Sequence, residues 1–161
     1  MSEKANAVLF QVAAQTLEQL TFFFVEKPED DDFLEPTDEM VTAVARFNGP
    51  FSGCMGISLA LNLLPEVASN MLGTDEGGIS DQEQIDAFKE MTNILCGNLL
   101  PKIAGPEKVF DIDSPVIFEK ANDFVPEKME LIGEAILAID ETDCKLQLFV
   151  EAPVPNELLK I

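Results

Sequence analysis

The sequence predicts an α+β fold in which long helices pack on an antiparallel β-sheet. The expected elements come in the order helix, two strands, two helices and then several strands, which differs from the regular alternation of a doubly wound parallel fold. The last two expected strands alternate apolar and polar residues, as a one-sided antiparallel pair does. The chain has 161 residues, of which 47% are hydrophobic, so we expect a single domain spanning 1–161 with a substantial core.

The N-terminal half of the chain predicts a helix followed by a β-hairpin. Apolar residues at near-helical spacing, an acidic Pro-containing stretch and two apolar runs around a turn define these elements. We expect the helix at 6–25, the loop at 26–39 and the strands at 40–47 and 51–59. The phenylalanines at 22–24 are expected where the helix enters the core. Gly53 and Gly56 indicate a bulge or a close approach of another backbone.

The C-terminal half predicts two more helices and a set of strands. A short helix spans 63–73 with Gly73 at its C-terminal cap. The best-marked helix begins with a capping box of Ser80 and Glu83 and runs past Leu99, where Pro101 is expected to bend or end it. Strands are expected at 109–118, 130–139 and 145–152, with a turn at 140–143.

Charge and composition exclude several classes of function. Ten Lys and Arg against 30 Asp and Glu give a net charge of −20, which disfavours nucleic acid and anionic membrane surfaces as partners. There is no His, which is the commonest general base and metal ligand. The three cysteines form no CxxC pair, so neither a disulfide framework nor a structural zinc site is expected. With no signal peptide or membrane-spanning stretch in the sequence, we expect a cytoplasmic protein.

One face of the long helix carries the candidate site. Asp86, Glu90, Asn93 and Gly97 follow one another at i, i+4, i+7 and i+11, which places them on one stripe. The opposite side is apolar, with Ile85, Phe88, Met91 or Thr92, Leu95 and Leu99. An acidic helix face is often only solvated, but Asn is a mediocre helix former in mid-helix. Gly97 leaves room for another backbone to approach.

The segment 86–98, DAFKEMTNILCGN, resembles the D/S-xxx-E-xx-N signature of the CheC/CheX/FliY chemotaxis phosphatase family. The resemblance extends over about 41–150, because three further segments match in the same order as in the family. These are the glycine-bearing strand at 51–59, the end of the short helix at 68–73 and the strand entry with Pro115 at 111–117. The resemblance implies a CheC/CheX-like fold and is stronger to CheX than to CheC.

The resemblance implies a phosphatase that hydrolyses the aspartyl phosphate of a CheY-type response regulator. In that activity Asn93 positions the attacking water and Glu90 pairs with a lysine of the regulator, while Asp86, Gly97 and Asn98 contact the partner. Mg²⁺ is expected on the regulator, so the chain is expected to need no cofactor and no metal ligands of its own. CheX-like proteins form homodimers, which implies a homodimer here.

The first helix offers a weaker match to the same signature, with Glu18 kept and Thr21 in place of the Asn. It is either a degenerate second site or an ordinary amphipathic helix, and in both cases one working site is expected. The chain also departs from the family at Leu99-Leu100-Pro101, where a Lys often follows the Gly-Asn pair.

Three alternatives remain open at this point. The same helix face fits a non-catalytic adaptor that docks on a receiver domain or a flagellar switch component. Four acidic residues on the helix are candidate metal ligands, but they spread over more than two turns without a matching second helix: Asp81, Glu83, Asp86 and Glu90. Cys96 is interpreted as a small buried apolar residue rather than a nucleophile, because no His or Lys stands close in sequence to activate it.

Overall fold

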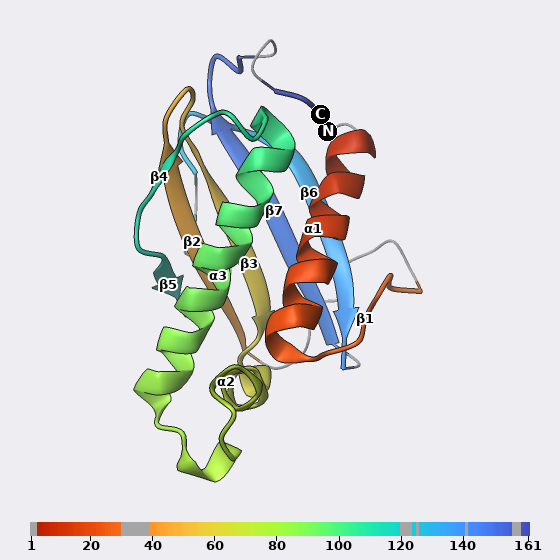
Figure 1. Cartoon of the computed structure of the whole chain (residues 1–161), viewed down its shortest axis with the longest axis vertical. Coiled ribbons are helices and arrows are strands. Elements are labelled where there is room, and N and C mark those ends of the chain that lie inside the picture. The colour runs from red at the N-terminus through yellow and green to blue at the C-terminus, as the bar shows by residue number, and fades with distance from the viewer. Residues whose placement is uncertain (1–2, 30–38, 120–123, 125, 141, 156–158) are drawn as a thin grey trace.

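The fold is an antiparallel sheet with helices on one face, as the sequence predicts (Figure 1). A computed structural model describes residues 3–29, 39–119, 124, 126–140, 142–155 and 159–161. The helices are α1 (Glu3–Thr21), α2 (Leu64–Leu72) and α3 (Asp81–Ala104), with short 3-10 turns η1 (Leu61–Leu63) and η2 (Glu76–Gly78). The strands are β1 (Val25–Glu26), β2 (Met40–Asn48), β3 (Gly53–Ala60), β4 (Asp111–Ile112), β5 (Val116–Phe118), β6 (Met129–Ile139) and β7 (Thr142–Glu151).

The seven-stranded sheet has the order β1-β6-β7-β3-β2-β4, and β5 also pairs with β2. All of these pairings are antiparallel. Helices α1 and α3 lie side by side across the sheet, with α1 over β6 and α3 over β2 (Figure 1). None of the helices in the described part of the chain is long and apolar enough to cross a lipid bilayer.

The core lies between the two long helices and the sheet. Alternate side chains of each central strand point to the helices, because successive residues of a strand face opposite sides of the sheet. Its largest fully buried members come from the three helices and from strands β3 and β6: Leu9, Leu17, Leu64, Phe88, Met91, Leu95, Leu99, Ile103, Met55, Ile57, Leu59 and Leu137. Burial of one such side chain stabilises the fold by about 1.5–3 kcal/mol. This core therefore holds α3 at a fixed rotation.

The first helix ends earlier than the sequence predicts, at Thr21 rather than at residue 25. Phe22 adopts a left-handed backbone conformation with φ 61°, and the chain then runs extended into β1. In an extended chain, alternate side chains point in opposite directions. Phe23 is accordingly buried, whereas Phe22 and Phe24 are each 76% exposed. The expectation that all three phenylalanines enter the core is therefore wrong for two of them.

Pro115 divides an expected strand, and Pro101, which was expected to bend or end α3, does not end it. The expected strand at 109–118 is divided into β4 and β5, and Pro115, which has no N–H for the ladder, lies between them. Pro101 does not end α3, because the helix continues through it to Ala104. The amide of Gly105 then donates to the carbonyl of Pro101 over 3.0 Å. At Pro115, the pairing with β2 determines where β4 and β5 begin and end. At Pro101, packing against the core keeps the chain helical although proline disfavours a helix interior.

Gly53 provides the close backbone approach that its strand position indicates, and Gly56 does not. A Cβ atom added to Gly53 would overlap the carbonyl oxygen of Phe149 and lie 2.8 Å from the ring of Phe47. A Cβ atom on Gly56 would lie 3.7 Å from the Phe124 ring, which is an ordinary contact. Strand β7 thus approaches Gly53 too closely for any side chain.

These two glycines give a matched test of the sheet. We expect Gly53→Ala to lower the free energy of unfolding by about 1–3 kcal/mol, because β3 and β7 must move apart. Gly56→Ala should change it by no more than about 0.5 kcal/mol. Urea unfolding followed by circular dichroism measures both values. Equal effects of the two substitutions would contradict the register described here.

Candidate functional site

A capping box fixes where the site helix α3 begins. The amide of Glu83 donates to the Ser80 hydroxyl over 3.1 Å, and the Ser80 amide donates to the Glu83 carboxylate over 3.2 Å. Two amides that would have no partner in the first turn of the helix are satisfied in this way. The capping box predicted from the sequence is therefore present, and it defines the start of the helix.

The outer face of α3 presents the predicted stripe. The side chains of Phe88, Leu95 and Leu99 are fully buried on the opposite face. Ile85, also expected there, is only half-buried, and both Met91 and Thr92 are buried. Asp86, Glu90 and Gly97 are exposed, and Asn93 between them is half-buried. The structure thus places a carboxylate and a carboxamide, about 4.5 Å apart along the helix axis, on one accessible surface.

Among the described residues, the side chains of Glu90 and Asn93 have no polar partner. Within the described part of the chain, neither takes part in a side-chain hydrogen bond or an ion pair. Asp86, by contrast, accepts a hydrogen bond of 2.9 Å from the amide of Gln82. Among the described residues, the atom nearest to a Cβ placed on Gly97 belongs to the Ile112 side chain, at 4.0 Å. Within the described part of the chain, therefore, the centre of the stripe has no polar partner and its far end is uncovered.

Asn98 does not point along this stripe with the other predicted residues. It is exposed, but its amide donates to the hydroxyl of Thr16 over 3.0 Å, and Thr16 lies buried on α1. This hydrogen bond joins the two long helices that cover the sheet. Spacing along one helix cannot reveal such a contact, because the partner residue is 82 positions away in the chain.

The first helix does not repeat the arrangement. Glu18 is exposed, but Thr21 is fully buried and its hydroxyl donates to the carbonyl of Leu17 over 2.6 Å. A buried hydroxyl that is already donating cannot orient water at the surface. The geometry of α1 therefore fits an amphipathic helix and gives no support for a second site.

The described residues also bear on the metal and thiol alternatives. In the part of the chain that is described, no three His, Cys, Asp or Glu side chains converge so that they could hold a metal ion. Cys54, Cys96 and Cys144 are buried and free. Burial raises the pKa of the Cys96 thiol to about 12, which suppresses the reactive thiolate. Cys96 is therefore a packing residue of α3.

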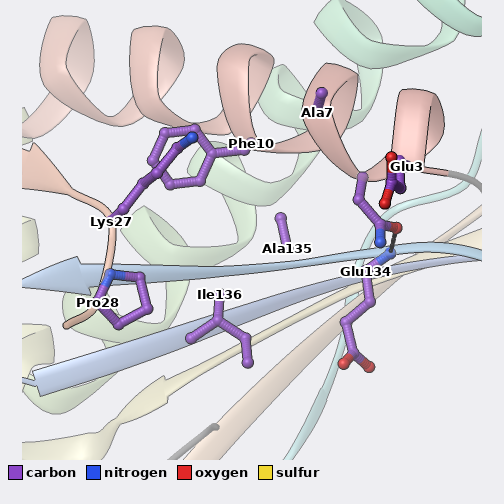
Figure 2. Close-up of a pocket in the computed structure, with 9 residues that line it drawn as sticks. Glu3, Ala7, Phe10, Lys27, Pro28, Glu134, Ala135 and Ile136 are labelled. Atoms are coloured by element: carbon purple, nitrogen blue, oxygen red, sulfur yellow. Dashed lines mark hydrogen bonds between the residues drawn. The ribbon is translucent and has the colours of Figure 1, made fainter. Parts of the chain in front are cut away.

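A separate open groove of about 700 Å³ lies on the β6 side of α1 (Figure 2). In it the Lys27 ammonium lies 5.6 Å from the centroid of the Phe10 ring, and the side-chain oxygen of Asn6 accepts from the Glu134 amide over 2.8 Å. No residue of the α3 stripe lines it. No local pattern in the sequence indicates this groove, because its walls come from three distant segments.

Comparison with known proteins identifies a family with which the chain shares sequence features. The family model described as "Chemotaxis phosphatase CheX" matches residues 41–130, which is more than half of the chain. No curated protein sequence matches the chain significantly.

Several solved structures share the fold. The chemotaxis protein CheX from Vibrio vulnificus superposes with a TM-score of 0.68 at 19% identity, covering 93% of this chain and 97% of that one. A CheX from Desulfovibrio desulfuricans gives 0.67 at 15% identity, covering 92% and 99%. A structure of the CheX-CheY-BeF3-Mg+2 complex from Borrelia burgdorferi gives 0.64 at 16% identity, covering 91% and 97%. At these identities the likeness concerns the fold.

The burial of the thiols predicts their reactivity. Burial raises the pKa of Cys144 to about 12 and that of Cys54 to about 11, so at about pH 8 almost no thiolate forms in the folded protein. We expect Ellman's reagent to label none of the three thiols until denaturant is added. A Val109→Cys variant, whose residue is 80% exposed, should react at once as a control. Rapid labelling of a native thiol would contradict this burial.

The contact between Asn98 and Thr16 predicts coupled effects on stability. We expect Asn98→Ala to lower the free energy of unfolding by about 1–3 kcal/mol, because it leaves the buried Thr16 hydroxyl without its partner. Thr16→Val removes the hydroxyl itself, so the double variant should be more stable than the sum of the single effects predicts. Urea unfolding of the four proteins gives the coupling energy. Strict additivity would show that the hydrogen bond contributes nothing.

Proposed function

Because the chain belongs to the CheX family of chemotaxis phosphatases, we propose that it hydrolyses the aspartyl phosphate of a CheY-type response regulator. The observation that carries this proposal is the pair of side chains on the outer face of α3, Glu90 and Asn93, which have no polar partner among the described residues. The Borrelia burgdorferi structure, a complex of CheX with CheY, BeF3 and Mg+2, supports the choice of partner. The chain shares that fold over 91% of its length.

Asn93 supplies the step that the chemistry needs most. An acyl phosphate is already reactive, so its hydrolysis depends on a water molecule held in line with the bond to be broken and on charge compensation. The amide oxygen of Asn93 accepts a hydrogen bond from this water and so orients it, as a glutamine does in GTPases. The water attacks phosphorus, the bond to the aspartyl oxygen breaks, and inorganic phosphate leaves.

Glu90 fixes the register of the docked helix. A carboxylate one turn before Asn93 forms a charge-assisted hydrogen bond with a lysine beside the phosphorylation site of the regulator. Asp86 and Gly97, on the same stripe, contact the regulator on either side, and Asn98 supports the end of the contact. Mg²⁺ held by the regulator compensates the phosphoryl charge, so this chain contributes no metal ligand and takes no cofactor of its own.

The wider assignment follows the resemblance to CheX. We propose that residues 1–161 form a single domain of this family and that two copies associate as a homodimer. We place the protein in the cytoplasm with the regulator on which it acts.

Substitution of the two side chains separates catalysis from docking. We expect Asn93→Ala to lower kcat by about 10²–10³-fold with binding retained, by analogy with the loss of one preorganised polar group in other active sites. Glu90→Ala should act mainly on KM, because it removes a docking contact. Both are measured from the decay of the phosphorylated regulator, and Glu18→Ala on α1 provides a matched control that should behave as wild type.

An adaptor would give the opposite result. If wild-type protein binds the phosphorylated regulator and leaves the phosphate lifetime unchanged, the protein docks without hydrolysis. If Asn93→Ala retains full activity, the amide does not position the water.

A further inference from the structure

The helix that carries the site contains a proline one turn beyond Gly97. In an α-helix the amide at position i donates to the carbonyl at position i−4. Pro101 has no N–H, so the carbonyl of Gly97 lacks the donor that an uninterrupted helix would give it. The helix nevertheless continues to Ala104. By the i to i−4 geometry, a backbone acceptor thus loses its usual donor within a continuous helix, before the last turn, where carbonyls without a donor are normal.

Gly97, which carries this acceptor, lies at the surface and on the site stripe. Gly97 is exposed, and since glycine has no side chain, the exposed atoms belong to its main chain. Pro101 is exposed on the same side of α3. Asn98, the neighbouring residue with a polar side chain, directs its amide to Thr16 on α1. Gly97 follows Asn93 by about 6 Å along the helix axis, so a molecule that docks on Asn93 also reaches this carbonyl.

We propose that the Gly97 carbonyl oxygen is a docking acceptor that receives an N–H hydrogen bond from the receiver domain bound at Glu90 and Asn93. This inference rests on the proposed function, and it adds a partner contact that comes from the backbone. The matching group on the partner is an ammonium or a main-chain amide, because these donate to a carbonyl. Pro101 is then a positioning residue, since it acts by leaving the carbonyl unoccupied.

Replacement of Pro101 should stabilise the fold and weaken docking of the regulator. Pro101→Ala supplies an N–H to Gly97 and removes a residue that disfavours helix interiors, so the midpoint of thermal unfolding should rise. The same change occupies the acceptor. We expect KM for the phosphorylated regulator, and Kd for the regulator loaded with beryllofluoride and Mg²⁺, to rise about three- to tenfold. The value of kcat should stay within about twofold, because the contact is made equally in ground and transition states.

Two controls distinguish the missing N–H from the proline ring. Lactic acid at position 101, which replaces the amide by an ester, removes the ring without supplying an N–H and should keep the wild-type KM and Kd. Pro106→Ala removes an exposed proline outside α3 and should leave all values unchanged. A rise in KM and Kd for Pro101→Ala but not for the ester supports the docking acceptor.

Three outcomes would overturn the inference. Unchanged KM and Kd in Pro101→Ala would show that the free carbonyl makes no contact. Equal weakening in the ester and the alanine variant would assign the contact to the ring. If wild-type protein neither binds the loaded regulator nor shortens the phosphate lifetime, both the proposed function and this inference are wrong, whereas activity in wild type with no effect of Pro101→Ala removes the inference alone.

Discussion

Burial of one face of α3 is the constraint on which the site depends. Phe88, Leu95 and Leu99 lie on that face with no exposed surface. A rotation of the helix by about half a turn would expose them and bury Asp86 and Glu90 instead. Since each large apolar side chain contributes about 1.5–3 kcal/mol and an unpaired buried carboxylate costs more still, no surface interaction can compensate for such a rotation. The direction of the polar stripe is thus determined by the core.

Polar contacts at several levels of the helix complement this packing. The capping box of Ser80 and Glu83 sets its start, and Asn98 joins it to α1. Near its end, the amide of Lys160 donates to the carbonyl of Ile103 over 2.7 Å, which attaches the C-terminal segment. All of these contacts lie away from the centre of the stripe. The helix is held by its inner face and its ends, so the groups at Glu90 and Asn93 keep their hydrogen-bonding capacity for another molecule.

Local sequence patterns predicted the elements whose signals lie within a few residues. They failed where contacts between distant segments determine the structure. The capping box, the apolar period of α3 and the alternation in β6 and β7 were sufficient to predict those elements and the exposed stripe. The bounds near Phe22, Pro101 and Pro115 were not predictable in this way. The chain leaves the helix at Phe22 because β1 pairs with β6. The helix continues through Pro101 because Leu100 and Ile103 are buried in the core. The orientation of Asn98 likewise depends on Thr16, which only the folded chain brings near.

The net charge of −20 explains why the contacts must be local. A strongly acidic surface gives no long-range attraction toward an acidic protein partner, so electrostatic steering cannot select it. At physiological ionic strength, charges more than about 8 Å apart are largely screened. In the proposed complex, recognition is then left to groups that touch: a carboxylate for a lysine, an amide for a water and a backbone carbonyl for an N–H. The proposed surface needs few residues, because in that complex the labile bond and the metal ion belong to the partner. The proposed enzyme therefore requires a rigid helix with a correctly directed face rather than an enclosed pocket.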